Sequence, residues 1–100
     1  GDQYLLSVTI HEDRLAIERA WPDQREKELQ VLPVRKILNA VPGEVSYQEF
    51  MAISEDLFEY SKTQSCRYYV RATEAANTKD GFLNGLRAIE ERFYKLAENF

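Results

Sequence analysis

The stretch YLLSVTIHEDRLAIERAW, residues 4–21, carries the pattern on which the fold depends. Apolar and polar side chains alternate through residues 4–11 and again through residues 15–21. A period of two residues is typical of a β-strand that buries one face. The stretch therefore predicts two strands joined by a turn at residues 12–14. The buried face of the first strand is predicted to carry Leu6, Val8 and Ile10.

The turn between these strands contains no Asn-Gly or Asp-Gly pair, so a helix from Asp13 to Ala20 is the competing interpretation. After the charged residues 22–28, the segment ELQVL at 28–32 predicts a third strand. Residues 33–40 begin with a proline and stop before Pro42, which predicts a short helix.

A capping box opens the next segment. Ser46 and Glu49 form the S-x-x-E pattern, and Val45 and Phe50 occupy the positions of a hydrophobic staple. Apolar residues then recur at helical spacing. The pattern predicts a helix with one buried side that ends near Lys62.

The run SCRYYVRAT, residues 65–73, alternates like a strand and predicts a fourth one. Asn77 or Thr78 is then expected to cap a last helix. Its apolar positions recur every three or four residues as far as Phe100, so we expect this helix to reach the end of the chain.

The expected order is strand, strand, strand, helix, strand, helix. It predicts a two-layer α+β domain, in which a meander of three strands is followed by a helix, a strand and a helix, with the helices mainly on one sheet face. One hundred residues with 44% hydrophobic content fit one globular domain, residues 1–100. The chain begins at Gly1 rather than Met, which leaves two interpretations open: a scar from the removal of a tag, or a domain excised from a longer chain.

This element order is carried by residues 4–21, by the helix from residue 46 and by CRYYVRATEAANTKDGF, residues 66–82. It resembles the first part of the ribonuclease H-like fold, as in the YqgF-type Holliday-junction resolvases and, more loosely, the actin-like ATPases. The resemblance implies a metal-binding aspartate near the end of the first strand and a second acid near the end of the fourth. Glu74 matches the second acid approximately, but Thr9 stands where the first belongs. We therefore expect a non-catalytic relative without a metal or cofactor, and an active nucleic-acid enzyme is the alternative.

The charge balance limits the classes of partner that the chain is expected to bind. Thirteen basic and seventeen acidic residues give a net charge of −4, which opposes non-specific binding to nucleic acid. No apolar stretch approaches the roughly 20 residues of a membrane span, and the first residues lack the order of a signal peptide. The single cysteine, Cys66, permits no internal disulfide and suits a reducing compartment. We therefore expect a cytoplasmic protein that does not enter a membrane.

Nucleophilic catalysis finds little support in the sequence. His11 and Cys66 are the single residues of their types and could in principle pair as base and nucleophile. The alternation places them on opposite faces, so we interpret Cys66 as a packed thiol. The sequence contains no glycine-rich phosphate-binding pattern, no G-x-S-x-G motif and no H-E-x-x-H motif.

One face of the predicted sheet is expected to be at least partly open, because none of the clearest strands is apolar on both sides. In residues 65–73 the alternation places two arginines on this face, about 13 Å apart with a tyrosine between them. Two interpretations stay open: a site for an anion or small ligand, or a solvated strand that the arginines protect from edge pairing. The candidate binding residues are Arg67, Tyr69, Arg71, His11 and Glu18.

The sequence favours a protein-interaction domain, an accessory or regulatory unit whose partner is another protein or a second copy of the chain. A homodimer could form in two ways. In the expected element order the fourth strand is a sheet edge, which can recruit another strand. Gly81, Gly85 and Ala88 also form a small-residue stripe on the last helix, which permits a close helix contact between copies.

Overall fold

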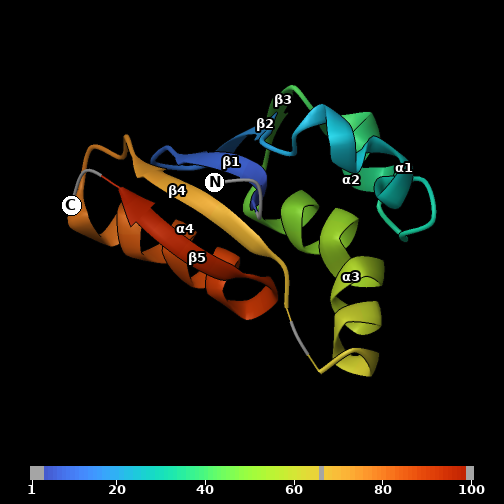
Figure 1. The fold of residues 1–100 in the computed structure, drawn as a ribbon. Coiled ribbons are helices and arrows are strands. Elements are labelled where there is room, and N and C mark those ends of the chain that lie inside the picture. The colour runs from blue at the N-terminus through green and yellow to red at the C-terminus, as the bar shows by residue number, and fades with distance from the viewer. Residues whose placement is uncertain (1–3, 66, 99–100) are drawn as a thin grey trace.

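The computed structural model of the chain describes residues 4–65 and 67–98 (Figure 1). Five strands form one mixed sheet in the order β3-β2-β1-β4-β5. They are β1 (Tyr4–Ile10), β2 (Leu15–Arg19), β3 (Gly43–Val45), β4 (Tyr69–Glu74) and β5 (Tyr94–Glu98). β1, β2 and β3 are antiparallel neighbours, whereas β4 lies parallel to β1 and β5 parallel to β4. The predicted α+β class is confirmed.

The first hairpin forms as the alternation predicts. Ile10 lies opposite Leu15 at its closed end, and both side chains are buried. The His11 amide donates to the Arg14 carbonyl at 3.0 Å and closes the turn. The competing helix from Asp13 to Ala20 is therefore wrong, because cross-strand apolar pairs and ladder hydrogen bonds stabilise the hairpin instead.

The predicted strand at residues 28–32 is wrong. The chain instead forms a 3₁₀ turn at Asp23–Arg25 and the short helix α1 (Glu26–Leu29). Leu29 is buried and Leu32 packs against the core, whereas Val31 is 82% exposed, so the apolar positions of this segment do not follow the alternation of a strand. Glutamate, lysine and leucine are also good helix formers. The third strand forms later, at β3, where it pairs with β2.

The next two helices follow the sequence pattern. The predicted short helix is α2 (Arg35–Ala40), and the helix with the capping box is α3 (Tyr47–Thr63). Ser46 Oγ accepts a hydrogen bond from the Glu49 amide at 3.0 Å, and Glu49 Oε1 accepts one from the Ser46 amide at 3.2 Å. These bonds satisfy amides that a helix start leaves without intrahelical partners, which determines where α3 begins.

The last helix ends earlier than predicted. α4 (Lys79–Arg92) starts after Thr78, one of the two predicted caps, but the chain leaves the helix at Phe93. Residues 94–98 then form β5 beside β4. Over so few residues, apolar spacing alone does not distinguish a helix from a strand. Hydrogen bonds to β4 stabilise residues 94–98 as a strand. Phe100, the expected end of the helix, lies outside the described residues.

The two main helices pack on one face of the sheet. Figure 1 shows α4 behind β4 and β5. The covered face carries buried residues of three strands: Leu6, Val8, Ile10, Leu15, Ile17, Val70 and Ala72. They form one core with Phe50 and Leu57 of α3 and Ile89 of α4. The opposite side, which we call the open face, carries the half-buried Ser7 and Thr9 of β1. The predicted two-layer arrangement is confirmed.

α3 is the longest helix that the structure describes, with 17 residues, and its exposed side is charged. Across residues 4–65 and 67–98, no helix combines the length and the apolar composition that a membrane crossing requires.

Candidate functional site

Three tyrosines lie side by side on the open face, one from each of β1, β4 and β5. Tyr4 pairs in register with Tyr69, and Tyr69 with Tyr94. The ring centroids of Tyr4 and Tyr69 are 6.4 Å apart with the planes at 89°, and those of Tyr69 and Tyr94 are 5.2 Å apart at 50°. Tyr69 is 40% exposed and Tyr94 43% exposed. We call these three residues the tyrosine row.

A register shift in β1 brings Tyr4 into the tyrosine row. Tyr4 pairs with Tyr69 and Leu6 pairs with Val70, so β1 has one extra residue at this point. The extra residue is Leu5, and both Leu5 and Leu6 are buried. Strict alternation would place Tyr4 on the covered face with Leu6. The bulge moves its ring to the open face instead.

Arg71 and Glu18 lie at strand positions that belong to the open face. Ser7 of β1 stands between them in the sheet, paired with Glu18 on β2 and with Arg71 on β4. The guanidinium carbon of Arg71 lies 4.8 Å from the centre of the Tyr4 ring, within the range of a cation–π contact. Among the candidate binding residues, Tyr69 and Arg71 therefore meet at the tyrosine row, and Glu18 lies on β2 outside it.

Arg67 packs against the helices at the end of the sheet, so its predicted place on the open face is wrong. Its guanidinium carbon lies 5.2 Å from the centre of the Phe58 ring of α3, and its Nη1 donates to the Glu90 carbonyl of α4 at 2.6 Å. The alternation fails here because β4 begins only at Tyr69. Cys66, predicted to be a packed thiol, lies outside the described residues.

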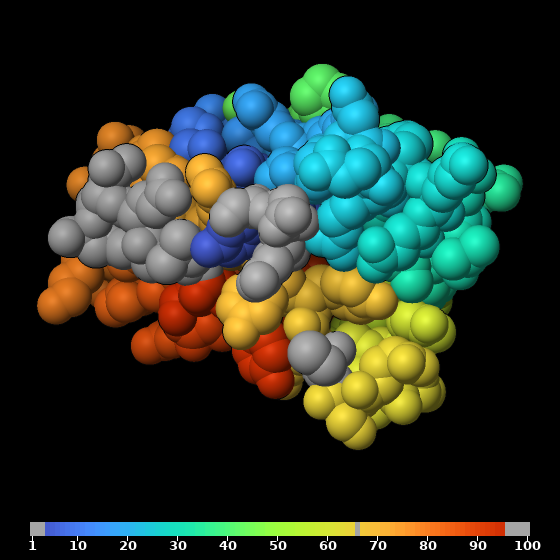
Figure 2. Space-filling view, in the orientation of Figure 1, coloured from blue at the N-terminus to red at the C-terminus, as the bar shows by residue number. Residues whose placement is uncertain are grey.

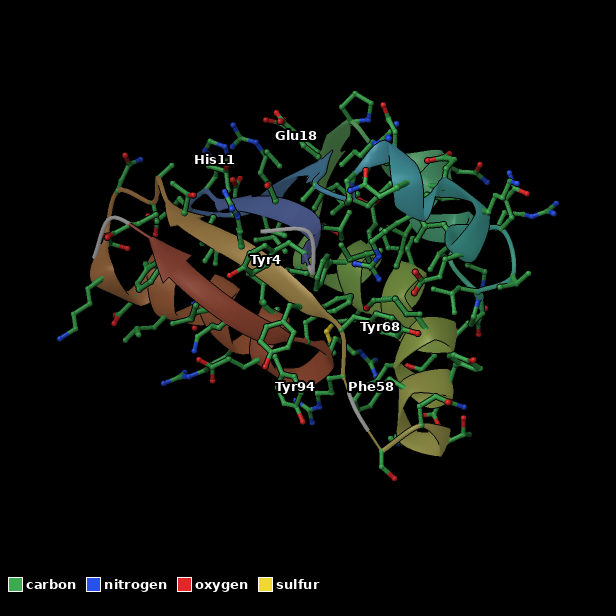
Figure 3. All side chains as sticks on the ribbon, viewed as in Figure 1. Tyr4, His11, Glu18, Phe58, Tyr68 and Tyr94 are labelled. Atoms are coloured by element: carbon green, nitrogen blue, oxygen red, sulfur yellow. The ribbon has the colours of Figure 1, made fainter. Side chains whose placement is uncertain are left out.

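Three cationic side chains meet at Phe58, which Figure 3 labels with Tyr94. Lys62 Nζ lies 4.7 Å from the centre of the ring, and the guanidinium carbons of Arg92 and Arg67 lie 4.8 and 5.2 Å from it. Their charges attract the negative face of the aromatic ring. The cluster joins α3, α4 and the segment that leads into β4.

Two shallow hollows lie where the tyrosine row ends at Tyr94, and Figure 2 shows atoms of β4 and β5 at the surface of this side of the molecule. The larger hollow, about 420 Å³, is lined by Arg67, Tyr69, Glu90, Phe93, Tyr94 and Lys95. The smaller one, about 200 Å³, is lined by Phe58, Ser61, Lys62, Ser65, Arg67 and Tyr94. Arg67 and Tyr94 line both, so the hollows adjoin each other.

His11 lies at the opposite end of β1 from the tyrosine row. β1 runs from Tyr4 to Ile10, which separates His11 from the tyrosine row by roughly 20 Å along the strand. The His11 carbonyl accepts a hydrogen bond from the Tyr47 hydroxyl at 2.9 Å. The five candidate residues therefore do not form one cluster.

The sequence did not predict two members of the tyrosine row, Tyr4 and Tyr94, as site residues. Alternation assigns Tyr4 to the buried face, and the apolar spacing assigns Tyr94 to a helix. The signal that could have found them is the tyrosine near the start of each of three alternating segments, at positions 4, 69 and 94.

The turn after β1, near the acid that the resemblance implies, holds a carboxylate with a structural role. Glu12 Oε1 accepts from the Thr78 amide at 2.9 Å, and Glu12 Oε2 accepts from the Thr78 hydroxyl at 2.6 Å. The hydroxyl contact, more than any other, lowers the pKa of Glu12 below its ordinary value. Thr9 pairs with Thr73, the residue before Glu74. Within the described part of the chain, no three His, Cys, Asp or Glu side chains group closely enough to hold a metal ion.

The fourth strand is not a sheet edge, so that part of the prediction is wrong. β5 pairs with β4 from Tyr69 to Thr73. The main chain that was expected to be unpaired over residues 67–73 is therefore covered along β4. The prediction failed because it placed the residues of β5 in the last helix.

The small-residue stripe on α4 packs inside the chain. A Cβ at Gly85 would overlap the Ile10 side chain, and a Cβ at Gly81 would overlap the Glu12 carboxylate. Both glycines are buried. They let α4 approach β1 and the turn that follows it, so this stripe is not exposed for a helix contact between copies.

A comparison of the sequence with protein-family models finds no matching family. Comparisons with curated proteins and with solved structures find no significant match. The functional proposal is therefore based on the geometry of the open face.

Proposed function

We propose that this chain is a non-catalytic protein-interaction domain, an accessory or regulatory unit that binds its partner on the open face. The observation that carries the proposal is the tyrosine row, where Tyr69 and Tyr94 are 40% and 43% exposed. Tyrosine is enriched in protein interfaces because its ring supplies a large, rigid apolar area and its hydroxyl supplies a hydrogen bond. Adjacent exposed aromatic rings on neighbouring strands are typical of a binding surface.

The distribution of exposed apolar side chains supports this proposal. Four large ones are exposed among the described residues, and two of them, Tyr69 and Tyr94, are neighbours in the tyrosine row. Val31 lies in the connection after α1, and Tyr60 lies on α3. Single exposed apolar residues are common on protein surfaces, whereas grouped ones are associated with binding.

The test compares the proteins that the domain captures with and without the tyrosine row. The intact 100-residue chain serves as bait in a lysate of its native organism, beside Tyr69→Ala and Tyr94→Ala. Tyr60→Ala is the matched control, because Tyr60 is 36% exposed on α3. We expect at least one protein to be captured by both wild type and Tyr60→Ala. Neither tyrosine-row variant should capture that protein. Identical capture by all four baits would contradict the proposal.

A ribonuclease H-like nucleic-acid protein, active or inactive, is the second candidate. The strand order favours it, because β4 returns after α3 and lies parallel to β1 at the centre of the sheet. A meander, a helix and a returning strand are the elements on which the resemblance rests. Thr9, at the position of the first acid, favours an inactive relative over an enzyme.

A further inference from the structure

We propose that the outer edge of β5 pairs with the same edge of a second copy of this chain, in an antiparallel two-fold contact centred on Leu96. The inference goes beyond the proposed function, because it concerns the edge of the sheet rather than the tyrosine row. It rests on the place of β5 in the sheet, on the direction of its main-chain groups and on the charges along its five residues.

β5 is a border strand of the sheet. Within residues 4–65 and 67–98, β4 is the one strand that pairs with it, and Figure 1 shows β5 at the border of the sheet with α4 behind it. Proline residues and β-bulges commonly protect such an edge from pairing. The segment 94–98 contains no proline, and its register with β4 runs without a shift from Tyr94 to Glu98. The edge is therefore straight enough to accept another strand.

The main-chain groups of β5 point alternately toward β4 and away from it. The Tyr94 amide donates to the Tyr68 carbonyl at 2.9 Å, so the main chain of Tyr94 faces β4. In a parallel ladder this direction alternates from residue to residue, so the N–H and C=O groups of Leu96 also face β4, and those of Lys95 and Ala97 face outward. These outward groups have no main-chain partner in the part of the chain that the structure describes.

A two-fold axis at Leu96 provides partners for the outward groups. With Leu96 opposite its own copy, Lys95 stands opposite Ala97 of the second copy, and Ala97 stands opposite Lys95 of the second copy. The two residues of a hydrogen-bonded antiparallel pair exchange both of their N–H···O bonds. Every outward N–H and C=O group of Lys95 and Ala97 therefore gains a partner in this register.

The charges of β5 also favour this register. Lys95 and Glu98 are the charged residues of the segment 94–98. In the register centred on Leu96, Lys95 stands opposite Ala97 and Glu98 stands opposite Tyr94, so like charges do not meet. A register centred on Lys95 would place two lysines directly opposite each other, which is unfavourable. The strand is therefore complementary to itself in one particular alignment.

Lys95 does not block the contact. A lysine on an edge strand opposes pairing where its charge would be buried without a partner. Lys95 Nζ lies 3.2 Å from a carboxylate oxygen of Glu90 on α4. The charge of Lys95 is therefore already paired within its own chain, and the contact between copies leaves it paired.

The other border strand, β3, is less suited to such a contact. β3 has three residues whereas β5 has five, so it offers fewer main-chain hydrogen bonds. A contact of β5 with β3 of another copy would also be heterologous and would extend into an open chain of molecules. The contact of β5 with itself closes as a dimer.

The proposed contact has a consequence for the open face. It joins the sheets of two copies into one continuous sheet, and its two-fold axis is perpendicular to that sheet. Both open faces then lie on the same side, so the two tyrosine rows belong to one surface. A partner with two binding segments would gain avidity from this arrangement.

Sedimentation velocity of the 100-residue chain tests whether the dimer forms. Five paired residues in each copy make a small interface, which is typical of weak association. We expect a monomer–dimer equilibrium between about 10 µM and about 1 mM. A monomer throughout this range would overturn the inference.

A proline substitution assigns the dimer to the edge of β5. Ala97→Pro removes one outward N–H group from each copy and none of the amides that face β4, and proline is tolerated on an edge strand at such a position. We expect the dissociation constant to rise by about tenfold or more. Ala97→Ser keeps the amide and should stay within about threefold of wild type. Urea unfolding verifies that both variants are folded, and unchanged dimerisation by folded Ala97→Pro would overturn the inference.

A disulfide tests the register and does not depend on whether Ala97→Pro folds. Leu96→Cys and Tyr94→Cys are compared, each together with Cys66→Ser. In the proposed register the Cα atoms of the two copies of residue 96 are about 4.5 Å apart, within reach of a disulfide, whereas those of residue 94 are separated by about 14 Å along the strand. Mild oxidation should therefore link Leu96→Cys into a dimer and leave Tyr94→Cys a monomer on a denaturing gel. Equal linking of the two variants, or none by Leu96→Cys, would overturn the inference.

Two further outcomes separate this inference from the proposed function. If Ala97→Pro loses the dimer but captures the same protein as wild type, the edge and the tyrosine row are separate surfaces, and both proposals are supported. If Ala97→Pro loses a captured protein that Ala97→Ser retains while the wild-type chain sediments as a monomer, the edge accepts a strand of another protein. That outcome would overturn the inference of a second copy.

Discussion

Glu12 in the β1–β2 turn accepts two hydrogen bonds from Thr78, the N-cap residue of α4, at 2.9 Å from the amide and 2.6 Å from the hydroxyl. The Thr78 hydroxyl in turn accepts from the Gly81 amide at 3.0 Å. Glu12 therefore extends the cap of α4 and ties the helix to the hairpin. Its negative charge at a helix N-terminus is also favourable.

Glu12→Gln should lower the urea midpoint at neutral pH, and the difference from wild type should shrink as the pH falls. The contacts with Thr78 lower the pKa of Glu12 below its ordinary value of 4.5. A lowered pKa in the folded state contributes stability that is fully present above pH 4.5 and is lost as the pH falls through the lowered value. Urea unfolding from neutral pH down to about pH 2 measures this window. Glu74→Gln is the control, and a difference for Glu12→Gln that stays constant with pH would contradict the prediction.

Ser46→Ala should lower the free energy of unfolding by about 1 kcal/mol, because it removes the acceptor of the Glu49 amide in the capping box. Gln48→Ala, an exposed change in the same turn, should leave it nearly unchanged. Urea unfolding compares the three proteins. A Ser46→Ala protein as stable as wild type would mean that the cap does not contribute to the stability of α3.

Phe50→Ala and Phe93→Ala should each lower the free energy of unfolding by about 3–5 kcal/mol. Phe50 is fully buried and Phe93 is 3% exposed, and their ring centroids are 5.9 Å apart. Because the two rings touch, the double variant should differ from the sum of the single ones. Chemical unfolding of all four proteins tests this, and a cost near zero for either single variant would remove that ring from the core.

Gly85→Ala should destabilise the domain although alanine is the better helix former. The helix preference favours alanine by about 1 kcal/mol, whereas overpacking a filled core costs about 1–3 kcal/mol. The added methyl group would meet the Ile10 side chain, so the second effect should prevail. Asn84→Ala, on the exposed side of α4, is the matched control and should be neutral or stabilising. A stabilised Gly85→Ala protein would show that α4 can move away from β1 at little cost.

Magnesium and manganese should neither bind tightly nor support cleavage of branched DNA or of an RNA–DNA hybrid. The reason is that Thr9 supplies no carboxylate at the position of the first acid that the resemblance implies. Calorimetry measures metal binding, and gel assays measure cleavage. Metal-dependent cleavage that Glu74→Gln abolishes would overturn the non-catalytic proposal.

Local patterns in the sequence determined the parts of the fold that depend on neighbouring residues. The alternation in residues 4–21 predicted the hairpin, and the Ser46–Glu49 capping box predicted the start of α3. Each signal reflects interactions within a few residues, or one pairing across a short turn, and these are stable enough to persist in the fold. Alternation in residues 15–21 placed Glu18 at an open-face position, and alternation in residues 65–73 did so for Tyr69 and Arg71.

Only the tertiary structure decided β3, β5 and the tyrosine row. β3 has three residues and β5 has five, and each gains its ladder hydrogen bonds from a strand distant in the sequence. Tyr94 joins the tyrosine row because β4 pairs with β5, and Tyr4 joins it because the bulge at Leu5 changes the register of β1. A short apolar segment is compatible with helix or strand, and the hydrogen-bonding partner that chooses between them appears only when the chain is folded.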